Sequence, residues 1–431
     1  MRGSTTLCAM ALLLALSATA LASNGMNMIG STTRGSGMAG ADVAMEGDCS
    51  GAAVNPATMG TLSDHALSVG LSVLHPPIHL KNGMLGPNDL DSEDQYFPIP
   101  FVAYSRRLGE DSPWTVGMTV YGQGGLGVKF EDVQTFAGTR DGFESDLQFV
   151  RLSPTTAYRV NDHLTVGASL LASYARMKLS LFPNTYTPGM SPGPEDDFAG
   201  VDLDDISGLG VAGRAGLLYR VCDQLSIGVT YTSETAMDLG DGDLTMNLGM
   251  ARATYDADVE DFTFPQEAEI GVAVRPLEGL TVAADARWIN WSDAVEDGYA
   301  VGRNPNLPLP PEAGTVRVPF NTKWDDQWVF AVGLEYALNE RHVLRCGYNY
   351  GENPVPDRYA TPLFPVTVEE HVTVGYGLTG EDWRFDVAYE RSFEISQDNT
   401  NPNPMENPFG PDATITAEAG QVIHLAVTRW F

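Results

Sequence analysis

The sequence predicts an all-β protein, a transmembrane antiparallel β-barrel of about 14 strands with an N-terminal plug, or hatch, segment. Apolar and polar residues alternate strictly in many runs after residue 61, and short turns alternate with long polar segments. Alternation with a period of two gives each strand one apolar face, and no helical pattern is present to cover so much apolar surface. No later run approaches the roughly 20 apolar residues of a membrane-spanning helix. The strands themselves are therefore predicted to cross the membrane.

The first 22 residues are predicted to be a secretory signal peptide. Arg2 supplies a positive start, residues 9–16 form an apolar run, and Ala20-Leu21-Ala22 is a small-x-small cleavage site. The mature chain then begins at Ser23.

Cysteine usage gives no disulfide framework. Cys8 leaves with the signal peptide, and Cys49, Cys222 and Cys346 remain without even or regular spacing. The sequence leaves open whether Cys49 and Cys222 form a disulfide.

The charge balance argues against a nucleic-acid partner. The chain carries 56 acidic against 25 basic residues, a formal charge of −31, and it has no basic patch. The acidic residues gather between strand-like runs, so we expect solvated loops there. These acidic segments are 195–197, 202–205, 238–243 and 256–261.

Residues 23–60 have a different character from the rest of the chain. They are rich in Gly, Ala, Ser and Met, show no alternation, and lack the large apolar residues with which a helix or strand buries a face. Because this segment directly precedes the strands, we expect it to pack inside what they build. The predicted division is a hatch over 23–60 and a barrel over 61–431.

Counting the alternating runs gives about 14 strands, an even number as in single-chain bacterial barrels. The predicted strands are 65–74, 97–108, 113–122, 145–160, 163–180, 205–221, 224–235, 262–275, 279–292, 325–338, 342–351, 366–379, 382–395 and 418–431.

The connections alternate in length, which is the outer-membrane pattern of short periplasmic turns and long outer loops. The predicted tight turns are 109–112, 161–162, 222–223, 276–278, 339–341 and 380–381, and the long segments include 183–201, 294–319 and 397–416. The chain ends on Phe431, and a terminal aromatic residue is typical of strands inserted by the barrel assembly machinery.

Several short stretches resemble one family in the same order. They are the small-residue run 35–42, Asn55-Pro56-Ala57, residues 125–130 after the third strand, 287–292 at the end of the ninth, and 353–358. Together they are similar to the FadL-type transporters that carry long-chain fatty acids and other hydrophobic compounds through Gram-negative outer membranes. The resemblance implies a plugged barrel in which outer loops capture the ligand, which then leaves sideways through the wall beside the third strand.

Carried over to this chain, the resemblance places the ligand path at the hatch residues Asn55, Pro56 and Ala57. It implies capture by the segments 181–204 and 236–261. It places the lateral opening opposite the hatch residues, at Tyr121, Gly122, Gly124, Gly125 and Gly127.

Residues 122–127 also match G-x-G-x-x-G, the dinucleotide-binding pattern. No helix follows to receive a pyrophosphate, so that function is not predicted. Glycine in a strand more often marks a bulge or the close approach of another backbone. A flexible loop start is the alternative.

Charged residues interrupt the inward faces of several strands. The simplest interpretation is a polar lumen whose charges pair with one another and with the hatch. Alternatively, one arginine binds a ligand carboxylate through two parallel hydrogen bonds. The residues concerned include Arg214, Asp285, Arg287, Arg345 and Arg384.

No metal, cofactor or catalytic group is predicted. Prolines between His75 and His79 exclude a helical ligand pair, and we expect an exposed loop there. The acidic run 238–243 lacks the spacing of a calcium loop, which leaves cation bridging to lipopolysaccharide as a second choice. No G-x-S-x-G motif gives a nucleophile its usual context.

The sequence thus favours a monomeric outer-membrane protein of a Gram-negative cell that passively takes up a hydrophobic molecule, a fatty acid or hydrocarbon. Its other expected partners are membrane lipids, lipopolysaccharide and the assembly machinery. The alternatives are a general porin or structural surface barrel, and after these an outer-membrane hydrolase. A porin needs no small-residue segment ahead of its first strand, which favours the plugged transporter.

Overall fold

The computed structural model describes residues 24–62, 65–83, 88–188, 197–295, 298–403 and 406–431. The predicted signal peptide and Ser23 lie outside these ranges. Within them, no helix has the length and apolar character needed to span a membrane.

Fourteen antiparallel strands close into a barrel, as the sequence predicts. Strand β1 pairs with β4 on one side and with β23 on the other, where Ala66 meets Trp430, so this sheet has no free edge along that seam. The barrel strands are β1 (Ala66–His75), β4 (Phe97–Arg107), β5 (Trp114–Gln134), β6 (Arg140–Arg159), β7 (Leu164–Thr187), β8 (Phe198–Cys222), β9 (Leu225–Thr232), β13 (Glu267–Leu277), β14 (Leu280–Ile289), β17 (Gln327–Ala337), β18 (His342–Gly351), β19 (Glu370–Thr379), β20 (Trp383–Ser392) and β23 (Gln421–Trp430).

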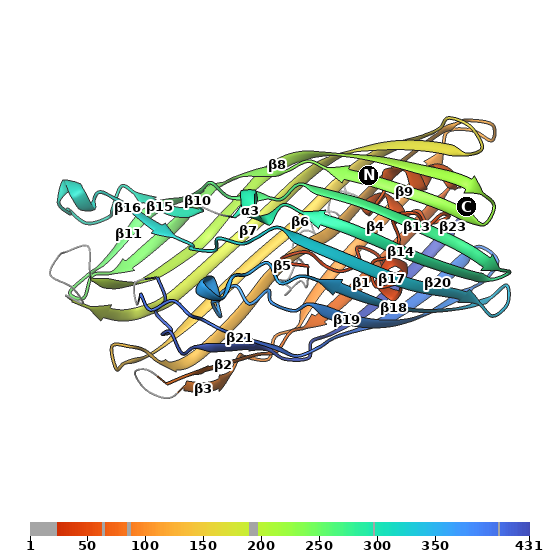
Figure 1. Ribbon diagram of the computed structural model, residues 1–431. Coiled ribbons are helices and arrows are strands. Elements are labelled where there is room, and N and C mark those ends of the chain that lie inside the picture. The colour runs from red at the N-terminus through yellow and green to blue at the C-terminus, as the bar shows by residue number, and fades with distance from the viewer. Residues whose placement is uncertain (1–23, 63–64, 84–87, 189–196, 296–297, 404–405) are drawn as a thin grey trace.

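Figure 1 shows the barrel with the tight turns at one end and the long connections at the other. The long connections build further structure: β10 (Thr235–Asn247), β11 (Arg252–Glu260), β12 (Thr263–Phe264), β15 (Tyr299–Arg303) and β16 (Thr315–Pro319) continue the wall. A separate sheet has the order β21-β22-β2-β3, from β2 (Ile78–Asn82), β3 (Asn88–Asp91), β21 (Ile395–Asp398) and β22 (Thr414–Ala417). Short helices complete the chain at α3 (Trp291–Ala294), η4 (Pro311–Ala313) and η5 (Asp357–Tyr359).

Three of the acidic segments predicted as loops are largely strands instead, so the prediction was wrong for them, whereas 195–196 of the fourth lie outside the described residues. Residues 202–205 lie in β8, 238–243 in β10, and 256–260 in β11. Leu203, Leu239 and Val259 are buried between the acidic residues. Alternation therefore holds in these segments too, with carboxylates on the polar face, and the acidic composition masked it.

Outward and inward faces differ as a membrane barrel requires. On β23 the outward side chains Ile423 and Val427 are each 51% exposed, whereas His424 and Thr428 between them are buried. The apolar row faces the membrane, and the polar row faces the lumen.

The N-terminal segment (residues 24–62) is almost entirely buried and lies inside the barrel outline in Figure 1. It contains α2 (Thr33–Gly37), η1 (Gly51–Ala53) and η2 (Pro56–Thr61). Thr32 caps α2, since its Oγ1 accepts a hydrogen bond from the Gly35 amide at 2.9 Å. Glycines in the wall give this backbone room: a Cβ on Gly228 would lie 2.2 Å from the carbonyl oxygen of Val43.

Candidate functional site

The wall of the barrel is interrupted beside the glycine-rich stretch of β5. The β4–β5 pairing ends at Phe101 opposite Tyr121, although β5 continues to Gln134. Residues 97–100 of β4 pair with β1 only, in the described register. Contact with β5 resumes where the Glu93 amide donates to the carbonyl oxygen of Lys129 at 2.9 Å. Between these points, residues 122–128 of β5 have left the β4 ladder.

A bulge stands at the start of this interruption. Gly122 is opposite Val150 and Gly124 opposite Phe149, so Gln123 is an extra residue on β5. The bulge predicted from the glycines is confirmed, and the alternative of a loop start is wrong, because β5 runs through the whole stretch.

The N-terminal segment pairs with β5 at the bulge. The Met28 amide donates to the carbonyl oxygen of Gln123 at 3.2 Å, and the Gly125 amide donates to that of Met26 at 2.9 Å. The side chain of Gln123 donates to Asn27 Oδ1 at 3.1 Å. A Cβ on Gly124 would lie only 1.8 Å from the Met26 carbonyl oxygen, so this approach requires glycine.

Asn55, Pro56 and Ala57 lie elsewhere, and the prediction that they face residues 122–127 was wrong. Asn55 Nδ2 donates to the carbonyl oxygen of Leu217 on β8 at 3.1 Å, and its Oδ1 accepts from the Ala57 amide at 3.0 Å. A Cβ on Gly167 of β7 would lie 2.5 Å from the Pro56 carbonyl carbon. The β7–β8 wall offers its own glycines, and Gly124 of β5 is already covered by Met26 and Asn27.

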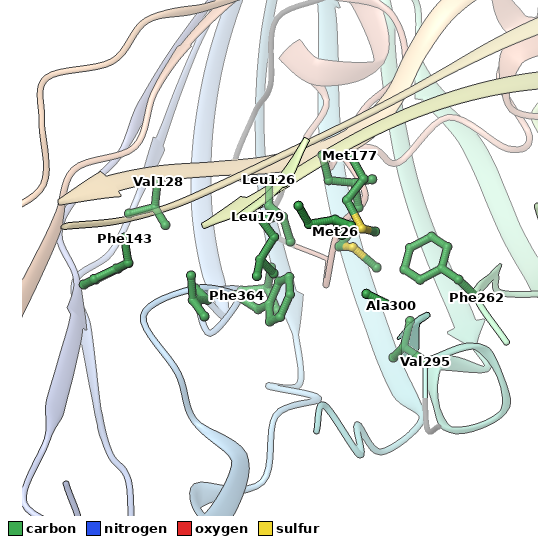
Figure 2. Packing of buried hydrophobic residues seen from close by; sticks show 14 of the residues in the cluster. Met26, Leu126, Val128, Phe143, Met177, Leu179, Phe262, Val295, Ala300 and Phe364 are labelled. Carbon is green, nitrogen blue, oxygen red and sulfur yellow. The ribbon is translucent and has the colours of Figure 1, made fainter. Parts of the chain in front are cut away.

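A large apolar cluster runs from the bulge to the end of the barrel that carries the long connections, which is called the outer end below. Figure 2 shows it passing from Met26 and Leu126, beside the bulge, to Leu179 and Phe364. Ring pairs extend it, with the centroids of Phe130 and Phe143 4.8 Å apart. These side chains point into the barrel in the half that carries the long connections. The interior of that half is therefore apolar.

A pocket of about 230 Å³ opens at the outer end of this cluster. An engineered apolar cavity of about 150 Å³ in another protein holds benzene, so the space admits an aromatic ring or a length of alkyl chain. The predicted capture segments contribute to it, but so do 317–321, 358–364, Asn399 and 406–409, which sequence reasoning missed. Among the lining residues are Leu179, Phe198, Met246, Leu363, Phe364 and Phe409, with Arg317 and Arg358 also present.

The predicted lumen charges are held by each other and by the N-terminal segment. Arg345 and Arg384 both bond Asp386, at 2.8 and 2.6 Å, and Arg345 also bonds Glu335 at 2.7 Å. The remaining contacts are Arg384 with Asp48 at 3.2 Å, Arg287 with Glu269 at 3.2 Å, the Val43 amide with Asp285 at 2.9 Å, and Arg214 with Thr232 at 2.8 Å and with the Ala53 carbonyl.

Arg151 on β6 is the buried arginine that sequence reasoning missed. It stands opposite Tyr121, next to the bulge, and its guanidinium carbon is 5.0 Å from the Phe149 ring centroid. Nη2 donates to Thr235 Oγ1 at 3.1 Å. Nε and Nη1 have no hydrogen-bond partner among the described residues. Its burial could have been predicted, because Arg151 lies between Phe149 and Ser153 in a row of alternating residues that share one face of the strand.

The three cysteines in the described part of the chain are free, so the open question of a Cys49–Cys222 bridge is answered in the negative. Cys49 is buried in the N-terminal segment, while Cys222 is exposed.

Asp42 makes the packing of the N-terminal segment sensitive to pH. Burial, and then the charge of Glu269, raise the pKa of Asp42 to about 7, although Arg287 and Arg34 oppose the shift and Asp48 adds to it. The folded protein therefore holds a proton that the unfolded chain releases from about pH 4 upward. The contribution of Asp42 to folding stability therefore falls as pH rises through the interval up to about pH 7.

We expect Asp42→Asn to remove this dependence. When the pH is raised from 5 to 8, the unfolding midpoint of the wild type should fall relative to that of Asp42→Asn. Both proteins are measured in the same detergent. Parallel profiles would show that Asp42 does not titrate in this interval.

Comparisons with known proteins agree with this geometry. A family model described as "Outer membrane protein transport protein (OMPP1/FadL/TodX)" matches residues 13–431. A long-chain fatty acid transport protein of Salmonella typhi is 23% identical over 336 residues, which are 73% of this chain and 74% of that protein. This is a family of passive outer-membrane channels, not of enzymes.

Solved structures share the fold. A Pseudomonas aeruginosa FadL homologue superposes with a TM-score of 0.73 at 17% identity, covering 94% of this chain and all of that one. The Pseudomonas putida toluene transporter TodX gives a TM-score of 0.72 at 20% identity, covering 96% and 99%. The chain accordingly crosses the Gram-negative outer membrane many times, with strands.

Proposed function

Because the chain belongs to the OMPP1/FadL/TodX family of outer membrane transport proteins, we propose that it binds hydrophobic molecules in its outer pocket and releases them sideways through the wall. Release takes place at residues 122–128 of β5, where β4 no longer pairs. Transport is passive and needs no cofactor.

The observation that carries this proposal is the continuity of the apolar cluster. Leu179 and Phe364 belong both to the pocket and to the cluster, and Met26 and Leu126 belong to the cluster beside the bulge. An apolar ligand moving along this path stays in contact with apolar side chains, so each step avoids the cost of exposing it to water.

The N-terminal segment acts in this proposal as the hatch. Barrels of about 8 strands are filled by their own side chains and those of about 16 leave a water channel, so a barrel of intermediate size needs further filling. Segment residues bond strands on different sides of the lumen, since Asn27 accepts from Gln123 of β5 at 3.1 Å and Arg34 donates to Glu335 of β17 at 2.7 Å.

Ion conductance separates this proposal from a general porin. The intact protein in a planar bilayer should pass no large steady current, because the segment and its ion pairs occupy the lumen. Deletion of residues 24–60 should produce a steady current, in protein that still migrates as a heat-resistant folded barrel. Large currents from the intact protein, or none from the folded deletion variant, would contradict the role of hatch.

The ligand class we propose is an alkyl or aryl carboxylic acid. Relatives are named as transporters of long-chain fatty acids and of toluene, and Arg151 favours the acid. Its two free donor nitrogens adjoin both the bulge and the apolar Phe149. A carboxylate there would complete the guanidinium hydrogen bonds while its chain remains in the apolar cluster.

Assembly and surface contacts stay predictions. Phe431 is 64% exposed beyond β23, as recognition by the assembly machinery would require. The four-stranded sheet and the extended wall lie at the end that we assign to the cell exterior, next to lipopolysaccharide. We expect a monomer.

A further inference from the structure

The outer four-stranded sheet places a histidine and three carboxylates from distant parts of the chain on one face. His79 of β2 is the cross-strand partner of Asp91 on β3 and of Thr416 on β22. Residues directly opposite share a face, and so do residues two apart along a strand. Asp89 and Glu418 therefore belong to the same face as His79.

The donor atoms are close enough to share an ion. One ligand atom from each of His79, Asp91 and Glu418 lies within 4.8 Å of the other two. All three residues are at least partly exposed, so small side-chain rotations bring these atoms to the roughly 2.0–2.2 Å ligand distances of a bound metal.

The imidazole ring of His79 lies between two carboxylates, so this face of the sheet attracts a cation. His79 Nδ1 is 2.7 Å from Asp91 Oδ1, and Nε2 is 3.0 Å from Asp89 Oδ1. The ring can donate to both carboxylates only when both of its nitrogens carry a proton, and a metal ion can take the place of one of these protons. The nearest cation from this sheet, Lys81 Nζ, is 4.0 Å from Asp89 Oδ2. A metal ion bound to one ring nitrogen would be attracted by the same carboxylates.

We propose that His79, Asp91 and Glu418 bind a divalent transition-metal ion, with zinc as the best match. One imidazole nitrogen with two carboxylate oxygens is a ligand set that zinc accepts in tetrahedral sites, with the fourth position open to solvent. Calcium takes about six to eight oxygen ligands, so the histidine argues against it.

The site has a consequence for the outer pocket. Asn82, at the end of β2, donates from Nδ2 to the carbonyl oxygen of Phe409 at 2.7 Å, and the Gly83 amide donates to Asp412 at 3.0 Å. Phe409 lines the pocket. A metal that joins β2 and β3 to Glu418 therefore links the first long connection to the last one. Both connections hold the part of the pocket wall that contains Phe409. This inference does not rest on the proposed transport.

Calorimetric titration of the full-length, tag-free, EDTA-treated protein with zinc chloride tests the site. We expect one zinc ion per chain in the wild type and at least a tenfold loss of affinity in both His79→Ala and Glu418→Gln. His75→Ala is the matched control, because His75 contacts Asp94 at 3.3 Å and stacks on Tyr96 outside this group. It should bind zinc like the wild type.

Heat-resistant migration of each variant verifies the barrel, and the near-isosteric Glu418→Gln keeps the test valid if His79→Ala misfolds. Zinc binding that survives both substitutions would overturn the proposal. So would calcium binding as tight as zinc binding and independent of His79, since that is the behaviour of an acidic surface without a built site.

Discussion

Gly124→Arg protein should insert into the outer membrane at wild-type levels and take up no hydrophobic ligand. A Cβ at position 124 already lies 1.8 Å from a backbone atom of Met26, so the side chain has to displace the N-terminal segment and occupy the break between β4 and β5. Uptake of a labelled fatty acid by cells that lack other uptake routes measures the effect. Normal uptake by well-inserted variant would defeat the proposal of lateral release.

A matched pair of alanine variants separates steric blockage from the general cost of losing a glycine. Gly213 lies on β8, where an added Cβ meets nothing within 4 Å. Gly213→Ala should transport normally, whereas Gly124→Ala should already lower the uptake rate. Equal uptake rates for the two variants would show that the close approach of Met26 to Gly124 plays no part in transport.

Arg151→Met should weaken binding of carboxylic acids by roughly 10- to 100-fold, the range given by losing one hydrogen-bonded charge contact of about 1.5–3 kcal/mol. Binding of the matching methyl ester should not change. The folded barrel should keep or gain stability, because the substitution removes buried donor nitrogens that have no partner in the described structure.

Displacement of a fluorescent fatty acid from the purified protein measures both ligands. Arg151→Lys is the informative intermediate, because lysine keeps the charge but lacks the planar fork. If acid and ester lose affinity equally in Arg151→Met, Arg151 only shapes the cavity. The substrate class would then shift to neutral hydrocarbons, while the apolar path would stand.

The strands could be predicted because their signal is local. Alternation and tight turns fix the type of each element from neighbouring residues, and all fourteen barrel strands fall at or near the predicted positions. The end of the third strand was misplaced at 122 because glycine removes the side chains by which alternation is read. β5 instead continues to Gln134.

The site was harder to predict because residues distant in sequence make it. Leu179 and Phe409 meet in one pocket only through the register of the barrel and its outer extension. His79 and Glu418 meet because the first and last connections share a sheet. The order of family motifs identified the transporter, but it did not say which wall Asn55 touches or that Met26 covers Gly124.

The pairing of β1 with β23 has a consequence for how the molecule is made and how it works. The N-terminal segment lies directly ahead of β1, yet the seam that encloses it forms only when the last strand arrives. The complete set of its buried ion pairs, such as Arg34 with Glu335 and Asp48 with Arg384, is therefore enclosed only when the ring closes. The closed ring also keeps the N-terminal segment inside the barrel. In the proposed mechanism the segment stays inside the closed ring while ligand passes beside the bulge.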